Sequence, residues 1–444
     1  MENDFFIQGG IQHMTQVPIS EVGKYENEFV SINGWLYNQR SSGKVKFMII
    51  RDGTGFLQGT LIQNEMEEKY FHLIDELNCE SSIIAEGIIK SEKRAPSGYE
   101  MLVRTLQVVH NAEKDYPISL KKHGPGFLMN YRHLWIRTQR QNAILRIRAE
   151  IVKSIHSFLN QKGFYLIESP ILTPAACEGT TTLFETDYFG DKAYLTQSGQ
   201  LYNEASAMAF GKVYCFGPTF RAEKSKTRRH LMEFWMVEPE AAYFDFQDNN
   251  QLQEEMIIAI VRHILDHCSL ELKILERDIS RLENIQSPFP YLSYDDAIEM
   301  IRKEGSQTQW GDDLGGEDET IISRKYQKPV FIHHFPTRCK AFYMKPDPER
   351  PETVLGADLI APEGFGEIIG GGQRIDDYQL IQERIREIHL PEDAYQWYID
   401  LRKYGSVPHS GFGLGIERTV AWICNLPHIR ETIPFPRMLN KMYP

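Results

Sequence analysis

Short apolar-rich blocks run through the first 110 residues, and polar or glycine-containing turns separate them. The blocks are rich in β-branched and aromatic residues, which is typical of half-buried strands. We expect five strands, at residues 30–37, 45–51, 56–62, 82–89 and 100–109. Between the third and the fourth, residues 65–77 place apolar side chains at the spacing of a short amphipathic helix.

Five strands with a helix after the third are typical of an OB barrel, a fold that often binds single-stranded nucleic acid. A five-stranded barrel of another topology is the alternative that the sequence leaves open. We therefore predict an N-terminal OB-fold β-barrel over residues 1–110. Residues 111–134, which hold Pro117, Gly124 and Pro125 among several charges, read as a hinge.

From about residue 140 the spacing of apolar residues along the chain changes to one that is typical of helices. Residues 144–159 carry Ile, Phe and Leu at helical spacing, and 252–268 predict a second amphipathic helix. Candidate strands lie at 164–167, 193–196, 213–216, 235–240, 330–333, 341–344 and 354–360. Strands outnumber helical crossovers, so residues 135–444 are expected to form a mainly antiparallel sheet flanked by helices. The predicted fold class is α+β.

Composition narrows the class only a little. At 444 residues and 42% apolar content the chain can bury more than one core. No apolar run approaches a membrane span, and the amino terminus lacks the features of a signal peptide. Six cysteines without C-x-x-C spacing argue against structural zinc and suit a reducing, cytoplasmic setting. The net charge of −12 is weak evidence against a nucleic-acid partner, since phosphate binding depends on local basic patches.

Two distant segments carry the chemistry. Phe220-Arg221-Ala222-Glu223 is followed by a basic loop and Phe234, and a glycine run from Gly411 ends in Arg418. Two arginines and an aromatic ring can hold a nucleoside triphosphate without a P-loop, because guanidinium groups bind phosphate and also stack on a purine.

The segments 194–201, 214–223 and 366–374, in this order, resemble the class II aminoacyl-tRNA synthetases. Within these they resemble the aspartate, asparagine and lysine subgroup, and most closely its asparagine-specific members. The resemblance covers nearly the whole chain, including the barrel. It implies that L-asparagine is activated with ATP, releasing pyrophosphate, and then passed to the 3′-terminal ribose of tRNA(Asn). It also implies Mg²⁺, a homodimer and a cytoplasmic location.

The resemblance gives the ATP site its residues. The implied ATP contacts are Arg221, Glu223, His230, Phe234, Glu367, Gly415 and Arg418. Arg221 and Arg418 are the expected catalytic residues, since the substrate carboxylate is already a nucleophile and the first step needs alignment and charge neutralisation. Asp358 and Glu367 would hold Mg²⁺. The alternative for either acid is a solvated surface charge, less so for Glu367, whose glycine-rich apolar strand would make an unpaired carboxylate costly.

For the amino acid, the resemblance implies Glu178, on a mobile loop, and Ser198 and Gln200 at the α-ammonium end. Arg374 would donate to the side chain, whether amide or carboxylate. Glu204 would accept from the asparagine amide and repel aspartate; the alternative is an ordinary acid on a helix surface. His409 would either contact the substrate or be a histidine that packs against other side chains of the protein.

The barrel would read the anticodon. The resemblance implies that Phe47 stacks on its middle base, that Gln58 hydrogen-bonds the same base, and that Arg40 contacts phosphate. The alternative for Phe47 is barrel core. Pro170 matches the end of a dimer-interface strand, although a plain strand terminator is the other interpretation.

Three other functions stay open. One is a non-discriminating aspartyl-tRNA synthetase that charges both tRNA(Asp) and tRNA(Asn), against which Asn203 and Glu204 count. Another is a catalytically silent RNA-binding paralogue, against which the retained site residues count. An asparagine synthetase of related fold would lack the barrel.

Overall fold

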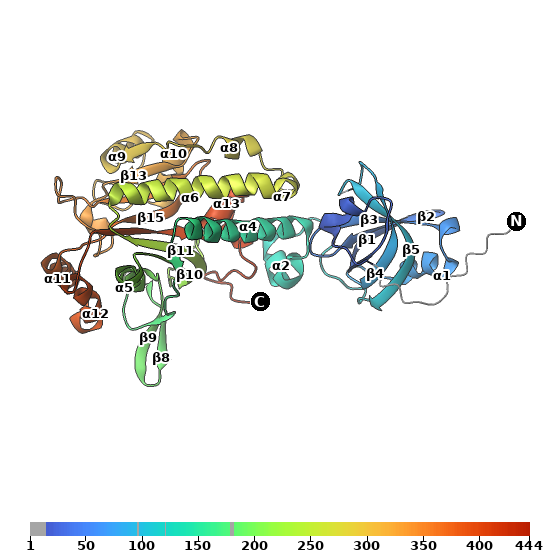
Figure 1. Ribbon diagram of the computed structural model, residues 1–444, viewed down its shortest axis with the longest axis horizontal. Coiled ribbons are helices and arrows are strands. Elements are labelled where there is room, and N and C mark those ends of the chain that lie inside the picture. The colour runs from blue at the N-terminus through green and yellow to red at the C-terminus, as the bar shows by residue number, and fades with distance from the viewer. Residues whose placement is uncertain (1–14, 96, 120, 178–181) are drawn as a thin grey trace. The chain divides into compact units, whose positions relative to one another are not determined.

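The computed structural model describes residues 15–95, 97–119, 121–177 and 182–444, which divide into two compact units that meet at Tyr131 and Arg132 (Figure 1). Each unit has its own hydrophobic core. Among the described residues, no helix is both long and apolar enough to cross a membrane.

The first unit is a closed barrel with strand order β1-β2-β3-β5-β4. Its strands are β1 (Phe29–Ser42), β2 (Val45–Arg51), β3 (Phe56–Ile62), β4 (Ser82–Ser91) and β5 (Tyr99–His110). Helix α1 (Glu68–Leu73) follows β3, and α2 (Pro125–Asn130) lies in the segment predicted as a hinge. The five-stranded barrel with its helix after the third strand is confirmed.

Alternation in β2 shows how the barrel is built. Met48 and Ile50 are fully buried in the barrel core, whereas Val45, Phe47 and Ile49 are only half-buried. Because side chains in a strand point to opposite faces in turn, Phe47 belongs to the outer face. The core interpretation of Phe47 is therefore wrong.

The second unit is built on an eight-stranded sheet of order β12-β13-β14-β15-β16-β11-β10-β6. Its strands are β6 (Tyr165–Leu166), β10 (Lys212–Phe220), β11 (Glu233–Ala242), β12 (Tyr291–Ser293), β13 (Val330–His333), β14 (Gly356–Ala361), β15 (Gly366–Gln373) and β16 (His409–Gly415). Only the end pairs, β6–β10 and β12–β13, are parallel. The predicted mainly antiparallel sheet is confirmed. A small sheet of order β7-β9-β8 comprises β7 (Leu172–Thr173), β8 (Glu185–Tyr188) and β9 (Asp191–Leu195).

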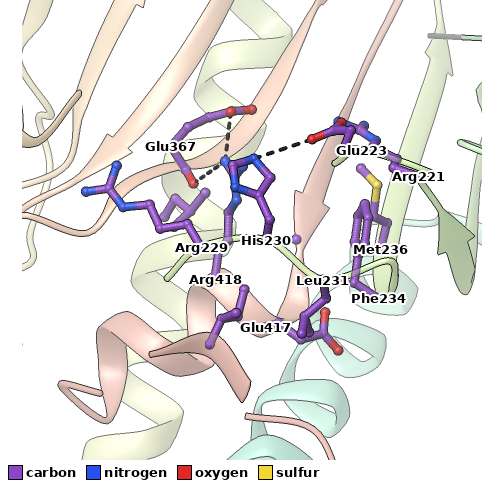
Figure 2. Close-up of a pocket in the computed structure, with 14 residues that line it drawn as sticks. Arg221, Glu223, Arg229, His230, Leu231, Phe234, Met236, Glu367, Glu417 and Arg418 are labelled. Carbon is purple, nitrogen blue, oxygen red and sulfur yellow. Dashed lines mark hydrogen bonds and ion pairs between the residues drawn. The ribbon is translucent and has the colours of Figure 1, made fainter. Parts of the chain in front are cut away.

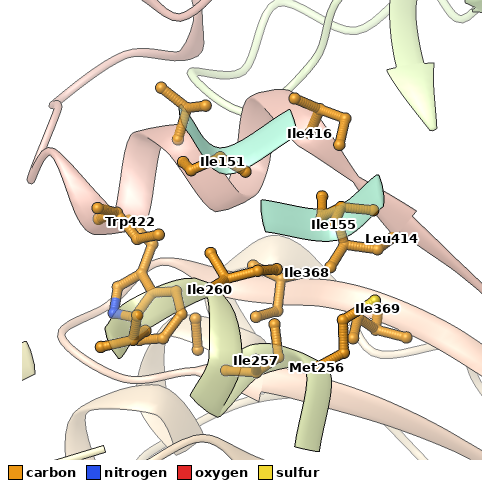
Figure 3. Close-up of a cluster of buried hydrophobic side chains, with 14 of the residues drawn as sticks. Ile151, Ile155, Met256, Ile257, Ile260, Ile368, Ile369, Leu414, Ile416 and Trp422 are labelled. Carbon is orange, nitrogen blue, oxygen red and sulfur yellow. The ribbon is translucent and has the colours of Figure 1, made fainter. Parts of the chain in front are cut away.

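Helices α4 (Gln139–Gln161) and α6 (Phe246–His267) run side by side along the sheet, and α13 (Ile416–Ile423) packs with them (Figure 1). Their apolar side chains share one core with β15 and β16 (Figure 3). The remaining helices are α3 (Arg132–Trp135), α5 (Gln200–Phe210), α7 (Ser269–Ile274), α8 (Ile279–Glu283), α9 (Tyr294–Lys303), α10 (Gly316–Lys325), α11 (Tyr378–Glu387) and α12 (Glu392–Lys403).

One predicted strand is wrong. Residues 341–344 form a turn with a single bridge, between Met344 and Arg374. Phe342 and Tyr343 are instead buried in a second core, where Phe342 contacts the rings of Tyr395 and Tyr398 on α12. An apolar run of four residues does not distinguish a strand from a buried turn, so its pattern alone was insufficient.

Candidate functional site

Strand β11 separates the core from the site. Val237 and Ala241 face the core, and the alternate residues Phe234, Met236, Glu238 and Glu240 line two cavities on the other face. The cavities are adjacent, since Arg221, Met236, Glu367 and Gly413 line both. Every second side chain of β11 therefore faces the cavities, from the aromatic Phe234 at one end to the acidic Glu240 at the other.

The glycines of β16 leave room for these side chains. A Cβ on Gly413 would stand 2.3 Å from Met236 Cε, and one on Gly411 would stand 2.0 Å from Glu240 Oε2. Neither contact is possible for a real side chain. The glycines of β16 therefore leave space for the side chains of the neighbouring strand β11, which pairs with β16.

The first cavity brings together the predicted ATP residues (Figure 2). Its lining includes Arg221, Glu223, His230, Phe234, Glu367, Gly415 and Arg418. The guanidinium of Arg221 lies 5.5 Å from the centre of the Phe234 ring. Its Nε is buried and has no hydrogen-bond partner among the described residues, which suits an anionic ligand.

Two pairs of polar side chains cross this cavity (Figure 2). Glu223 lies 3.5 Å from His230 Nε2, and Arg418 Nη1 lies 2.8 Å from Glu367 Oε2. Burial lowers the pKa of His230, and Arg418 lowers it further. His230 is therefore a neutral imidazole near pH 7. Arg418 is paired with Glu367, and its contact with a purine stays a prediction.

Asp358 and Glu367 meet over Gly370. Asp358 Oδ2 accepts a hydrogen bond from Lys340 Nζ at 2.5 Å, and Glu367 Oε2 accepts one from Arg418 Nη1. Their other oxygens lie 3.3 and 3.0 Å from the point where a Cβ on Gly370 would stand. Two oxygens that converge on a hollow suit a hard cation such as Mg²⁺, so the residues present fit that ion. Burial, opposed by Lys340, raises the pKa of Asp358 to about 7.

The second cavity contains the predicted amino-acid residues Ser198, Gln200 and Arg374. Arg374 makes a buried bidentate pair with Glu240, with Nη2 2.9 Å from Oε2 and Nε 3.1 Å from Oε1. Ser198 Oγ donates to Glu238, which also accepts from the Gly199 N–H at 2.9 Å. Three acceptors, Ser198 Oγ, the Gln200 amide and Glu238, thus gather on one wall.

Glu204 is placed differently from the expectation. It is fully buried, lines neither cavity, and binds Gln200, Tyr398, Arg402 and His409. Its carboxylate oxygens are thus occupied by protein donors, and a direct bond to the substrate amide does not follow from this geometry. The helix-surface alternative is wrong as well. His409 is also fully buried and lines neither cavity, in agreement with the packing interpretation.

Several site residues were not predicted. Glu238, Glu240, Glu319, Arg338 and Lys340 line the cavities. The two glutamates had a readable signal, because they continue the two-residue period that begins at Phe234. The other three come from loops and helices whose approach to the sheet no local pattern indicates. Glu178 lies outside the described residues.

On the barrel, the Arg40 guanidinium lies 4.6 Å above the centre of the Phe47 ring. Gln58, on the neighbouring strand β3, donates its amide to Glu100 at 3.0 Å. In the register, Arg40 pairs with Phe47, and Gln58 pairs with Ile49 on β2. The structure thus brings the three predicted anticodon residues to one part of the outer face.

Pro170 lies between the short strands β6 and β7, in a segment with unusual apolar exposure. Tyr165 is 61% exposed, and Leu166, Ile171 and Leu172 are each 40–44% exposed. β6 is also an end strand of the large sheet.

Comparison with known families agrees with this geometry. Residues 125–439 match the family model of class II tRNA synthetases (D, K and N), and residues 30–109 match the OB-fold nucleic acid binding domain. The chain therefore belongs to the class II tRNA synthetases of the D, K and N group.

Relatives narrow this class. The chain is 63% identical to the asparagine–tRNA ligase of Desulforamulus reducens, over 96% of this chain and 99% of the relative. It is 59% identical to that of Pelotomaculum thermopropionicum, over 97% and 100%. Asparaginyl-tRNA synthetase from Pyrococcus horikoshii, solved with asparaginyl-adenylate, matches with a TM-score of 0.92 and 43% identity, over 96% and 99% of the two chains. Within its class the chain belongs to the asparagine–tRNA ligases, which confirms the resemblance found in the sequence.

Proposed function

We propose that the protein activates L-asparagine with ATP to asparaginyl-adenylate and then transfers asparagine to the 3′-terminal ribose of tRNA(Asn). The observation that carries the proposal is the order of side chains along the cavity face of β11. Phe234 stands at one end, and Glu238 and Glu240 stand at the other. A nucleotide site and a site for a small polar amino acid are therefore continuous.

The wall formed by Ser198, Gln200 and Glu238 suits the α-ammonium of the substrate. The Ser198 hydroxyl proton is given to Glu238, so the serine oxygen remains an acceptor, and it accepts from the Gln200 N–H at 3.1 Å. An ammonium group offers three donors and no acceptor. A wall made of acceptors fits it.

The pair Arg374–Glu240 suits the side-chain amide. A guanidinium offers donors to the amide oxygen, and a carboxylate accepts from the amide NH₂. The side chain of aspartate is a carboxylate, so it would bring a further negative charge beside Glu238 and Glu240. In a desolvated pocket such a mismatch gives roughly 10⁴-fold discrimination. The geometry thus favours asparagine over the aspartate-accepting alternative.

Catalysis of the first step rests on alignment. Arg221 lines both cavities, so its guanidinium can bind the substrate carboxylate and the α-phosphate together, which a bidentate group does better than an ammonium. Phe234 would stack on adenine. Asp358 and Glu367 would hold Mg²⁺, which supplies charge neutralisation at the phosphates. Among the described residues no three acidic, histidine or cysteine side chains gather to hold a metal ion, so phosphate oxygens would complete its shell.

The barrel would recognise the anticodon of tRNA(Asn). Glu100 accepts from the Gln58 amide, so the Gln58 carbonyl oxygen is left for an RNA donor. Phe47 offers a stacking surface beside the cation of Arg40.

Exposed apolar side chains around Pro170, on an end strand, support a homodimer formed through this edge. The six cysteines, all free, support a cytoplasmic location. Sedimentation equilibrium tests the dimer. A monomer at micromolar concentration would contradict it.

The amino acid is tested by ATP–pyrophosphate exchange with each of the twenty amino acids. Asparagine should support exchange at least about 10³-fold better than aspartate, measured as kcat/KM. Glu240→Gln removes the charge that repels aspartate. It should therefore reduce the ratio of kcat/KM for asparagine to kcat/KM for aspartate, mainly by raising kcat/KM for aspartate. Exchange with aspartate as efficient as with asparagine in the unaltered protein would refute the proposal.

A further inference from the structure

Glu204 sits in a closed network behind the second cavity. It lies one turn after Gln200 on α5, and its side chain is fully buried. Oε1 accepts from Gln200 Nε2 at 2.9 Å and from the Tyr398 hydroxyl at 2.7 Å. Oε2 accepts from Arg402 and lies 2.9 Å from His409 Nε2. Tyr398 and Arg402 come from α12, so three elements hold this one carboxylate.

The charge of Glu204 is secured by these partners. Burial alone would raise its pKa, but Arg402 and the hydrogen-bonded His409 lower it below the ordinary value. An ionised carboxylate accepts hydrogen bonds and cannot donate them. The Gln200 amide can therefore turn only its NH₂ toward Glu204. Its carbonyl oxygen must point the other way, and Gln200 lines the cavity.

We propose that Glu204 is a positioning residue that fixes the amide of Gln200 with its carbonyl oxygen toward the substrate α-ammonium. The proposal rests on the proposed function of that cavity wall. Without a fixed partner an amide has two orientations of similar shape, one of which would present NH₂ to a cation. Glu204 excludes that orientation, because it would set the Gln200 oxygen against a carboxylate.

This assignment explains why a charged group is buried at this point. A neutral amide at position 204 could donate as well as accept, so it would leave Gln200 free to reverse. A carboxylate needs a counter-ion in an apolar interior, and Arg402 supplies it within the same network. The proposed function assigns Arg374 and Glu240 to the other end of the substrate, and both also interact electrostatically with Glu204.

Glu204→Gln tests the proposal directly. Arg402 would keep the oxygen of the new amide, so the NH₂ of that amide would face Gln200 and reverse its orientation. The KM for asparagine in pyrophosphate exchange should rise about ten-fold or more, since a donor would then meet the ammonium. The KM for ATP should change less than about two-fold. The inhibition constant of succinamate, which is asparagine without its α-amino group, should also stay within about two-fold.

Two further variants separate positioning from plain structural support. In a Gln200→Ala background, Glu204→Gln should raise the KM for asparagine no further, because its effect passes through Gln200. The exchange Gln200→Glu with Glu204→Gln conserves charge and gives the ammonium an acceptor in either orientation. It should recover most of the lost affinity, and it remains informative if Glu204→Gln alone does not fold.

Glu271→Gln is the matched control. It breaks a 2.7 Å pair with Arg146 in the same unit, and neither residue lines a cavity. It should lower the melting temperature without changing the KM for asparagine. Additive effects of Glu204→Gln and Gln200→Ala, or equal weakening of succinamate, would overturn the proposal. Failure of the unaltered protein to use asparagine would instead refute the proposed function.

Discussion

Gly413→Ala should impair ATP binding without harming the backbone. Gly413 does not have a positive φ, so alanine is compatible with its conformation. The new Cβ would stand 2.3 Å from Met236 Cε, whereas ordinary contact begins at 3.4 Å. Met236 must therefore retreat by about 1.1 Å, and it lines both cavities. Overpacking of this kind costs ~1–3 kcal/mol, and the lower end applies because methionine is flexible.

A cost of about 1–2 kcal/mol corresponds to a roughly 5- to 30-fold change in an equilibrium constant. We expect a rise of that size in the KM for ATP, measured by pyrophosphate exchange at saturating asparagine. Gly217→Ala is the control, because a Cβ on this β10 glycine meets nothing within 4 Å. Adding Met236→Ala to Gly413→Ala should restore much of the loss. An unchanged KM for ATP, or no recovery in the double variant, would refute the clearance role of the glycine.

Three other variants test other parts of the molecule. Arg221→Ala should lower kcat/KM for exchange by at least about 10³-fold, because it removes the cation between the two substrates. A much smaller loss of kcat/KM would show that Arg221 has no part in the mechanism. Phe47→Ala should leave exchange intact and weaken tRNA charging by about 1–3 kcal/mol of stacking; equal loss of both would contradict the assignment of the barrel. His428→Asn should flatten the pH dependence of unfolding between about pH 6.5 and 4. Burial, with Arg430 and Arg228, lowers the pKa of His428 to about 4, so the unfolded chain takes up a proton in that window that the folded chain refuses, and stability falls as pH falls. Asparagine can still accept from the Arg430 N–H, as His428 Nδ1 does; a variant that is as pH-sensitive as the parent would contradict this.

Local pattern was sufficient for the barrel. Buried and partly exposed side chains alternate in β4 and through most of β2, because one face is core and the other is solvent. The predicted ends of 45–51 and 56–62 agree with β2 and β3. The same rule would have found Glu238 and Glu240 once Phe234 was placed on the site face. That step requires knowing which face of β11 is covered by α4 and α6, and this depends on the tertiary structure rather than on the local sequence.

Long-range partners were beyond the sequence. Glu204 meets Arg402 and His409 about 200 residues later, and its own neighbourhood looks like an ordinary amphipathic helix. Lys340 reaches Asp358 from the end of the 3-10 helix Thr337–Cys339. In both places a charge is satisfied by a side chain from another element, so spacing along the chain carries no signal. Family resemblance named the candidate substrate contacts, but not the residues that hold them in place.

The ion pairs of the site differ in exposure, and the difference matches what each end must do. At the nucleotide end, Arg418 and Glu367 are 27% and 33% exposed. At the amino-acid end, Arg374 and Glu240 are 2% and 1% exposed, and Arg402 and Glu204 are fully buried. A partly exposed pair is held less strongly than a fully buried one, so Arg418 can leave Glu367 for a phosphate at a lower cost than either buried pair could be broken. Breaking a buried pair costs about 3–5 kcal/mol, so the amino-acid end keeps its donors and acceptors in place before any ligand arrives. The discrimination against aspartate that we propose needs that rigidity, because a carboxylate free to rotate or to take up a proton would accept either substrate. A site for a triphosphate needs cations that can exchange partners.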